Sequence, residues 1–334
     1  MTLLALERAT RRFGTGAAAI TAVDDVSLAV DRGEALCIVG ESGCGKTTTG
    51  KMLAGLLRPS AGRLLFEGQD VWGGPRELFA RFRRSVQLVH QDPYASLNPT
   101  RTVLQTLETP ILRHRTRDRR VARATALELL EMVGLTPAPD MAAKYPHQLS
   151  GGQRQRVAIA RALTVEPRAI VADEAVSMVD VSIRISLLDL LHGLATEFGV
   201  ATVLITHDLA VARYFGREGR VAVMYLGRVV ELAATEALVE DPAHPYTAAL
   251  VGAVPEADPE ITRGKTRVKL RSAEAPSLSA LPSGCSFHPR CPLMEPGLCD
   301  VQVPELLPLP GTRDVACHVA VRERTPAAEL LGAR

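Results

Sequence analysis

The sequence predicts an α/β fold built on a mainly parallel β-sheet that has helices on its faces. Short apolar segments recur before residue 240, and the clearest cover residues 34–39, 85–90, 169–172 and 201–205. Stretches with apolar residues at helical spacing lie between these segments. Apolar strands that alternate with helices are typical of parallel sheets buried on both faces.

Composition changes after about residue 240, where proline becomes frequent and long helices are disfavoured. The chain has 334 residues, enough for one large domain and a smaller one. We therefore expect a first unit over 1–240, an irregular second unit over 241–320 that needs a cross-link to hold its shape, and a tail over 321–334.

Charge and hydropathy limit the partners that the chain can have. The net charge is +2, from 39 basic and 37 acidic residues, which gives no reason to expect a nucleic acid. No run of roughly 20 apolar residues is visible, and Leu3 to Leu6 are too short for the apolar core of a signal peptide. We expect the chain to stay in the cytoplasm and to reach a membrane only through a partner.

The first strand leads into a glycine-rich loop, Gly40-Glu-Ser-Gly-Cys-Gly45-Lys46-Thr47, which fits the phosphate-binding pattern G-x-x-x-x-G-K-[ST]. Glycines let backbone N–H groups turn toward phosphate oxygens, and the helix that starts at Lys46 points its positive end at the same anion. Lys46 can reach the β- and γ-phosphates, and Thr47 can ligate Mg²⁺. The flanking strand and helix disfavour the alternative of a chance glycine-rich turn.

Cys44 lies inside this loop, close to Lys46 and to a helix N-terminus, and both features favour a thiolate. That hypothesis predicts inactivation by a thiol reagent and protection by Mg-ATP. The alternative, held equally, is a small inert residue that fills the loop.

Asp173 and Glu174 follow the apolar segment 169–172. An acid at such a strand tip can hold Mg²⁺, directly or through its water, and a second acid beside it can accept a proton from an attacking water. The alternative is a pair of residues that caps a helix.

Leu149-Ser150-Gly151-Gly152-Gln153 opens a helical pattern over 152–163 with free N–H groups, which makes a second anion site. One nucleotide needs only one phosphate loop. The second helix start therefore suggests a nucleotide bound by a different subunit, although an ordinary serine N-cap is an equal alternative for this segment alone.

These motifs and their order resemble those of the ATP-binding-cassette (ABC) ATPases over about residues 3–240. Six motifs carry the resemblance: Gly40 to Thr48 (Walker A), Gln91 in Val-His-Gln-Asp-Pro (Q-loop), Leu149 to Gln153 (signature), Ile170 to Glu174 (Walker B), Ser177-Met-Val-Asp180 (D-loop) and His207 in Ile-Thr-His-Asp (switch histidine). The resemblance implies a P-loop (RecA-like) nucleotide-binding core with a helical subdomain inserted at about 92–155. It also implies a head-to-tail dimer in which each ATP lies between Lys46 of one chain and Ser150 of the other.

The resemblance also assigns roles. Glu174 is the expected general base, Gln91 senses Mg²⁺ and water and links to the membrane subunit, and His207 contacts the γ-phosphate unless it is a plain strand-end histidine. Phe13 is expected to stack on adenine, although an aromatic residue in an N-terminal strand is more often core. The expected ligands are, for nucleotide, Phe13, Gly40, Ser42, Gly43, Cys44, Gly45, Lys46, Thr47, Thr48, Ser150, Gly151, Gly152, Gln153 and Asp180, and, for magnesium, Thr47, Gln91 and Asp173.

Two further segments, His90 to Pro99 and His244 to Leu250, resemble the dipeptide and oligopeptide importer branch, which also includes nickel importers. The context of Tyr94 resembles the second of that branch's two paired ATPases. The implied partners are a different ATPase, two transmembrane permease subunits and an extracytoplasmic substrate-binding protein. The implied location is peripheral, on the cytoplasmic face of the inner membrane. Peptides are the expected substrate, with nickel as the alternative.

The sequence departs from the family pattern at Ala175, where proline is usual, and at Met178 and Val179 in the D-loop. Both motif acids remain, so we expect activity, while the D-loop change bears on the contact across the dimer. A soluble ABC ATPase acting on DNA or ribosomes is disfavoured because the 91–150 interval has no room for a long coiled coil. The intact site residues disfavour an inactive regulatory cassette.

A basic run, 113–120, lies in the expected helical subdomain. A solvated helix face is the favoured interpretation, ahead of contact with a membrane subunit or with lipid headgroups.

Four of the six cysteines, Cys285, Cys291, Cys299 and Cys317, cluster near the C-terminus, where a reducing cytoplasm favours metal binding over disulfides. Their spacing matches neither the usual zinc pairs nor a ferredoxin pattern. Ser283 to Cys291 and Ala316-Cys-His318 resemble the C-terminal segment of peptide-importer ATPases, where such cysteines are associated with a 4Fe–4S cluster.

The resemblance therefore implies an iron–sulfur cluster. Zinc, with His288 or His318 as spare ligands, and free or disulfide-bonded cysteines are the alternatives. Since these cysteines lie far in sequence from every ATP motif, we expect a structural or regulatory role. On that basis Cys291→Ser should loosen residues 285–317 and spare ATP binding.

Overall fold

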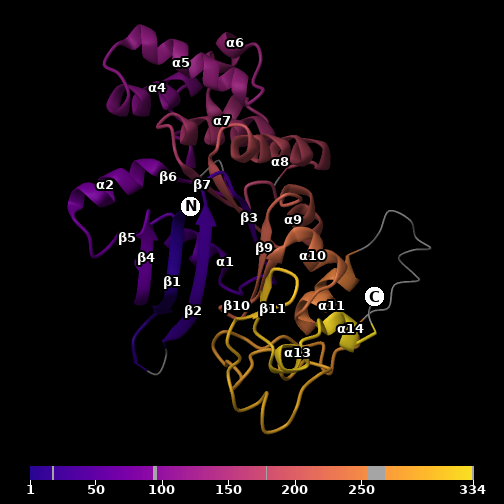
Figure 1. Ribbon diagram of the computed structural model, residues 1–334. Coiled ribbons are helices and arrows are strands. Elements are labelled where there is room, and N and C mark those ends of the chain that lie inside the picture. The colour runs from indigo at the N-terminus through magenta and orange to yellow at the C-terminus, as the bar shows by residue number, and fades with distance from the viewer. Residues whose placement is uncertain (17–18, 93–95, 178, 255–267, 333–334) are drawn as a thin grey trace.

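The computed structural model describes residues 1–332 apart from 17–18, 93–95, 178 and 255–267. Two sheets organise this part of the chain (Figure 1). The smaller sheet is antiparallel, with the order β2-β1-β4-β5. Its strands are β1 (Thr2–Phe13), β2 (Ile20–Asp31), β4 (Ala61–Phe66) and β5 (Gln69–Asp70).

The larger sheet has the order β11-β12-β10-β9-β3-β8-β7-β6, and its central strands run parallel. The parallel strands are β3 (Ala35–Val39), β6 (Val86–Val89), β7 (Ala169–Asp173), β8 (Ala201–Thr206) and β9 (Arg220–Tyr225). Every residue of β3, β7 and β8 is buried, because both faces of the sheet are covered. The predicted α/β class and its mainly parallel sheet are confirmed.

Successive residues of β3 point to opposite faces of the sheet, as strand geometry requires. Leu36 and Ile38 pack in a core that includes Met52 of α1 (Lys46–Leu53) and lies toward the smaller sheet. Cys37 and Val39 pack in the other core, with α8 (Val181–Thr196) and α9 (Leu209–Phe215). The strand that precedes the glycine-rich loop is therefore held from both sides.

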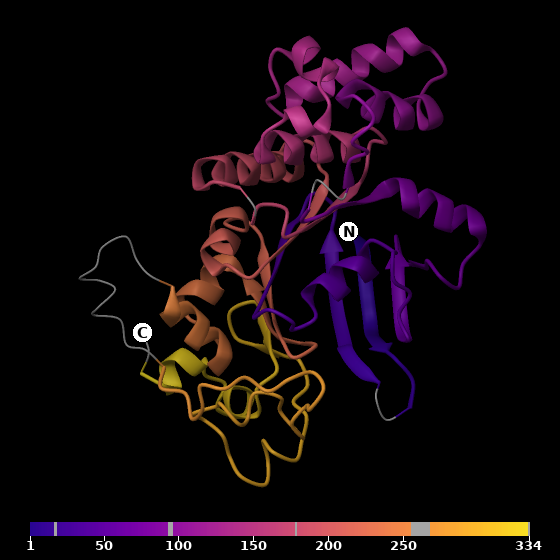
Figure 2. The ribbon, with the colours of Figure 1, turned by 180° about the vertical axis from the view of Figure 1, so that it is seen from behind.

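The helices between β6 and β7 form a group of their own, drawn at the top of Figures 1 and 2. This group comprises α4 (Val103–His114), α5 (Arg119–Met132), α6 (Ala138–Ala143), a 3₁₀ turn (Pro146–Gln148) and α7 (Gly151–Leu163). Outside it, α2 (Arg76–Ser85) precedes β6 and α10 (Thr235–Glu240) follows β10 (Arg228–Ala234). None of the described helices is long and apolar enough to cross a membrane.

The C-terminal part is mostly irregular, and residues 268–306 contain neither helix nor strand. It nevertheless extends the larger sheet, because β12 (Arg313–Val315) pairs with β10 and with β11 (Leu307–Leu309). Its helices are α11 (Pro245–Ala253), α13 (His318–Glu323) and α14 (Ala327–Leu330). The expected tail is packed where α14 lies: Ala327 and Ala328 are fully buried, and their N–H groups bond to the carbonyls of Ala243 and Pro242.

Candidate active site

The C-terminal ends of four adjacent parallel strands meet at one edge of the larger sheet, and polar residues follow each of them. The phosphate-binding loop follows β3, and Gln91 follows β6. Asp173 ends β7, Glu174 comes directly after it, and His207 follows β8. Ligands of open parallel sheets bind at this edge, so the strand order gathers these side chains where a ligand can reach them.

The loop between β3 and α1 follows the neighbouring backbone closely. A Cβ at Gly40 would lie 2.2 Å from the Met224 carbonyl oxygen, and one at Gly45, whose φ is +101°, would lie 2.3 Å from that of Ala22. Side chains are thus excluded at both positions. The Lys46 Nζ donates hydrogen bonds to the carbonyl oxygens of Gly40 and Glu41, both at 2.8 Å. The ammonium is therefore held inside the loop, within reach of an anion bound there.

The side chains proposed for magnesium form two pairs. Thr47 donates its hydroxyl to Asp173 Oδ1 at 3.0 Å. Burial raises the pKa of Asp173, and the hydrogen bond from Thr47 opposes that rise. Gln91 bonds to Glu174 and not to Asp173. Threonine and carboxylate oxygens suit Mg²⁺, which takes oxygen ligands.

Glu174 is contacted by the two other residues proposed for catalysis. Gln91 Nε2 donates to Glu174 Oε2 at 3.0 Å, and His207 Nδ1 lies 3.3 Å from Glu174 Oε1. The backbone of Glu174 has φ +47° and donates its N–H to the Ile205 carbonyl at 3.0 Å. A left-handed conformation is costly for a glutamate, so the surrounding contacts hold this backbone in place. The end of β7 thus places the Glu174 carboxylate between the Gln91 amide and the His207 imidazole, in contact with both.

The departures from the family pattern lie close to Glu174. Ala175 is buried, at 3% exposure, in the position where proline is usual. Ser177 donates its hydroxyl to the Glu174 carbonyl at 2.8 Å, which closes the turn after the strand. Val179 is half-buried against the core, whereas Met178 lies outside the described residues. Asp180 is exposed at the start of α8 and makes no side-chain cap bond there.

Ser150 caps α7 in a reciprocal arrangement with Gln153. Its hydroxyl accepts from the Gln153 N–H at 3.2 Å, and its own N–H donates to Gln153 Oε1 at 3.0 Å. A Cβ at Gly152 would lie 2.5 Å from Ile183 Cγ2 of α8, so glycine permits this close packing. The helix start borders a cavity of about 340 Å³ that includes Ser150, Gly152 and Gln153 in its lining.

The phosphate-binding loop contributes nothing to the lining of that cavity. Figures 1 and 2 also draw α7 among the upper helices and α1 below, beside the smaller sheet. The structure therefore brings the loop, Asp173, Glu174, Gln91 and His207 together and leaves Ser150 to Gln153 apart from them. The two helix starts that the sequence predicts to bind anions therefore lie at separate places in one chain.

The remaining predicted contacts lie at the surface of the same region. Ser42 and Gly43 are exposed on the loop, and Thr48 is half-buried in α1. Phe13 is 39% exposed at the end of β1, with the Arg11 guanidinium 4.8 Å from the centre of its ring. Phe13 is thus a surface residue, and its contact with adenine stays a prediction.

The surroundings of Cys44 disagree with the hypothesis that it is a thiolate. Its side chain is buried, at 3% exposure, and this burial raises the pKa of the thiol. Lys46 Nζ lies 3.8 Å from Cys44 Sγ and acts in the opposite direction, but burial is the larger effect. The structure favours the inert, space-filling alternative, because a buried neutral thiol reacts slowly.

The four C-terminal cysteines are free thiols in this structure, so the disulfide alternative is not borne out by it. Cys285 donates its N–H to the Cys299 carbonyl at 2.8 Å. Burial raises the pKa of Cys285 to about 11, and the neighbouring Cys317 and Cys299 add to the rise. No group of three or more histidine, cysteine or acidic side chains in the described part of the chain could hold a metal ion. A preformed zinc site is thus absent from that part.

The two spare histidines bond to backbone rather than to the cysteine thiols. His288 Nδ1 lies 2.9 Å from the Cys285 carbonyl oxygen, and His318 Nε2 lies 2.9 Å from that of Gln302.

The sequence analysis missed two residues that touch the phosphate-binding loop. Arg290 Nη1 donates to Glu41 Oε1 at 3.0 Å, and Tyr246 accepts a hydrogen bond from the Glu41 N–H at 3.0 Å. Tyr246 belongs to the segment His244 to Leu250, which was noted only for its resemblance to importers. No local sequence pattern predicts either contact, because Arg290 lies 249 residues and Tyr246 205 residues from Glu41.

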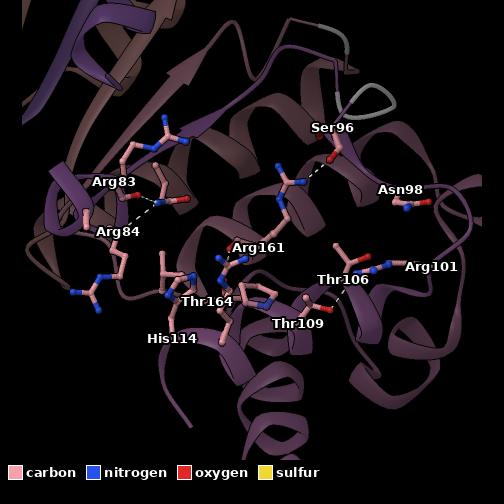
Figure 3. A pocket seen from close by; sticks show the side chains of 15 residues that line it. Arg83, Arg84, Ser96, Asn98, Arg101, Thr106, Thr109, His114, Arg161 and Thr164 are labelled. Atoms are coloured by element: carbon pink, nitrogen blue, oxygen red, sulfur yellow. Dashed lines mark hydrogen bonds between the residues drawn. The ribbon is translucent and has the colours of Figure 1, made fainter. Parts of the chain in front are cut away.

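A basic cavity of about 810 Å³ lies between α2, β6, α4 and α7 (Figure 3). Five of its lining residues are arginines and none is acidic: Arg83, Arg84, Arg101, Arg113 and Arg161. Of the basic run 113–120, Arg113 and His114 line this cavity, and both are exposed, as the predicted solvated face requires. Burial and the charges of Arg113 and Arg84 lower the pKa of His114.

Two family models match the chain. The model described as "ABC transporter" matches residues 23–177, which include the phosphate-binding loop and the strand end at Glu174. The model described as "Oligopeptide/dipeptide transporter, C-terminal region" matches residues 230–299, which include Tyr246 and three of the four clustered cysteines.

Curated proteins match over most of their length. A probable peptide ABC transporter ATP-binding protein of Sinorhizobium fredii is 48% identical over 316 residues, covering 95% of this chain and 86% of that protein. The oligopeptide transport ATP-binding protein AppF of Bacillus subtilis is 43% identical over 305 residues, with 90% of each covered.

Solved structures match the cassette part. A dimeric ATP-binding cassette, MJ0796, in a post-hydrolysis state bound to ADP and Pi, superposes with a TM-score of 0.63 at 31% identity. That comparison covers 70% of this chain and 99% of the other.

Proposed function

Since this chain belongs to the ATP-binding-cassette transporter family, we propose that it is the ATPase subunit that powers an importer of dipeptides or oligopeptides. The observation that carries this proposal is the convergence of Gln91 and His207 on Glu174, at the sheet edge that also holds the phosphate-binding loop. The peptide substrate rests on the C-terminal family match and on relatives that are named for peptide transport.

In the proposed mechanism Lys46 and the loop N–H groups hold the β- and γ-phosphates of ATP. Thr47 and Asp173, which are already hydrogen-bonded to each other, would hold magnesium, and magnesium when bound neutralises phosphate charge. Glu174 accepts a proton from the attacking water while the bond from the γ-phosphorus to the bridging oxygen breaks and ADP leaves. His207 and Gln91 orient the water and the γ-phosphate around that carboxylate.

We propose that Ser150 to Gln153 act on a nucleotide held by a second cassette. The separation of this helix start from the loop of the same chain supports the proposal, as does the dimeric state given for a cassette of similar fold. The second cassette would be a different ATPase subunit, as the importer branch implies. The proposal includes the expected division of the chain at residue 240. The expected parts are a cassette with a helical subdomain at about 92–155, a C-terminal domain over 241–320 and a terminal segment over 321–334.

We propose that the basic cavity receives an acidic segment of a transmembrane permease subunit. Arg83, Arg84 and Arg113 offer cationic side chains, and the described lining residues include no carboxylate. Complementary charge would orient the partner and exclude others. The chain would then lie at the cytoplasmic face of the inner membrane, and an extracytoplasmic binding protein would deliver the substrate.

The test is to express the chain with its permease subunits and partner ATPase, place the complex in lipid vesicles, and measure ATP hydrolysis. We expect binding protein loaded with peptide to stimulate hydrolysis, and binding protein loaded with Ni²⁺ to leave it unchanged. Stimulation by Ni²⁺ alone would identify the nickel importer instead. Hydrolysis that no membrane partner stimulates would contradict transport.

Reversing charge in the basic cavity tests the docking site in the same complex. Arg84→Glu with Arg113→Glu should release the chain from the permease and leave its ATP binding intact. The matched control, Arg119→Glu with Arg123→Glu, makes the same charge change at exposed positions of α5 outside the cavity lining and should keep the complex together. Release by both pairs would indicate a general charge effect.

We further propose that Cys285, Cys291, Cys299 and Cys317 hold a 4Fe–4S cluster that orders the irregular C-terminal segment. Cysteine thiolates are the ligands of this group, and three of the four side chains are buried, whereas the described side chains do not form a preassembled metal site. Protein purified without oxygen should be brown, with broad absorption near 400 nm and about four irons per chain. Cys291→Ser should remove the colour, whereas Cys37→Ser, in the buried strand β3, should keep it. Colourless anaerobic protein with one zinc per chain would overturn this assignment.

A further inference from the structure

The segment that carries the four clustered cysteines touches the phosphate-binding loop through Arg290, the residue directly before Cys291. Arg290 Nη1 donates to both carboxylate oxygens of Glu41, at 3.0 and 3.2 Å. The Arg290 side chain is only 9% exposed and the Glu41 side chain 35% exposed. The pair is thus shielded enough from water for its charges to matter more than those of an open surface pair.

Glu41 is also held through its backbone. Its N–H donates to the Tyr246 hydroxyl at 3.0 Å, and its carbonyl accepts from Lys46 Nζ at 2.8 Å. Arg290 and Tyr246 of the C-terminal part therefore bond to Glu41, the same loop residue whose carbonyl bonds to Lys46. A second wall of the loop comes from residues 275–278, which line a cavity of about 310 Å³ together with residues 41–44.

Because Glu41 carries a negative charge, its contact with Arg290 affects how the loop can bind an anion. A carboxylate in a loop that must receive a triphosphate repels that anion unless a cation compensates it. Arg290 supplies the compensating charge from outside the loop. We propose that Arg290 is a positioning residue for nucleotide: it neutralises and fixes Glu41, so that ATP affinity depends on the folded C-terminal segment. This inference rests on the proposed nucleotide site.

An aromatic group fixes where Arg290 lies. Phe287 is 1% exposed and packs on Tyr225 and Tyr246, with ring centres 5.3 and 5.5 Å away. The Arg290 guanidinium lies 5.7 Å from the centre of the Phe287 ring. The packing of Phe287 therefore fixes the position of Arg290. If residues 285–291 became disordered, Arg290 would lose its contact with Glu41. The expectation that Cys291→Ser spares ATP binding is revised: we expect it to weaken binding.

The test measures equilibrium binding of Mg-ATP to the full chain, with KM and kcat for hydrolysis beside it. Arg290→Gln should raise the dissociation constant and KM about tenfold and change kcat little, because the charge acts on binding. Arg290→Lys keeps the charge and should recover most of the affinity. In the Arg290→Gln background, Glu41→Gln should also recover most of it, since no carboxylate is left to compensate.

Arg313→Gln is the matched control, because Arg313 is a buried arginine of the same C-terminal part that pairs with Asp241 instead of the loop. It should lower thermal stability without raising the dissociation constant. Equal weakening by Arg290→Gln and Arg313→Gln, or no recovery on adding Glu41→Gln, would overturn the inference and reduce Arg290 to a structural residue. Lys46→Ala should abolish binding. If it binds as the unaltered chain does, the nucleotide site is misassigned and this inference falls with it.

Discussion

Replacing Glu174 with glutamine should lower steady-state ATP hydrolysis by about 100- to 10,000-fold, the usual contribution of a general base. Glutamine keeps the size of the side chain and can still contact Gln91 and His207, which lie 3.0 and 3.3 Å from the carboxylate oxygens. It cannot take the proton of the attacking water. Mg-ATP should therefore bind as before, because Lys46, Thr47 and Asp173 are unchanged, and the ATP-bound dimer should accumulate in its closed form.

Glu166→Gln provides the control for this result. Glu166 also has a left-handed backbone, with φ +53° against +47° for Glu174, and it too is a glutamate that pairs with a basic side chain. Its side chain is 70% exposed and its partner is Arg115, so it lies outside the site. The control should hydrolyse ATP within about twofold of the unaltered chain. Hydrolysis by Glu174→Gln at a similar rate would show that another group is the base.

The central sheet and the residues at its edge could be predicted because they rest on local patterns. The buried strands β3, β7 and β8 consist mostly of apolar residues, and β7 and β8 lead directly into Asp173-Glu174 and His207. The apolar segments placed Glu174 and His207 after two strands, and the resemblance to ABC ATPases assigned both to one nucleotide site. The pairing of β7 with β8, which no strand pattern predicts, brings the two side chains into contact.

The contacts made by the C-terminal part could not be predicted from such patterns. Arg290 gives no local indication that its partner is Glu41, because only tertiary packing brings together residues 249 apart. The pairing of β12 with β10 likewise depends on a strand of three residues, too short for an alternating pattern. Distance in sequence from the ATP motifs was therefore a poor guide to distance in space, and the proposed role of Arg290 replaces the expectation for Cys291→Ser that was based on it.

Ser150 presents the opposite case, since the sequence places it among the nucleotide motifs and the structure leaves it apart from them. Its helix start opens on a cavity lined by α7 and α8 and neighbouring turns, to which the phosphate-binding loop contributes nothing. The capping bonds with Gln153 already satisfy the hydroxyl and one N–H, so Ser150 also fits a purely structural role. The two interpretations differ in what a mutation of Ser150 does to ATP hydrolysis by the assembled pair of cassettes.

Ser150→Arg should lower ATP hydrolysis by the assembled ATPase pair on the order of 100-fold or more, because a bulky side chain would fill the place where the other cassette's phosphates must dock. Binding of Mg-ATP to the isolated chain should stay unchanged, since Lys46 and its loop are intact. Thr102→Arg is the matched control: Thr102 caps α4 through the same reciprocal bonds with Gln105, so it loses a comparable cap of about 1 kcal/mol without touching α7. If Ser150→Arg weakens binding to the isolated chain as much as Lys46→Ala does, Ser150 serves its own chain's nucleotide. If it matches Thr102→Arg in hydrolysis, Ser150 is only a cap.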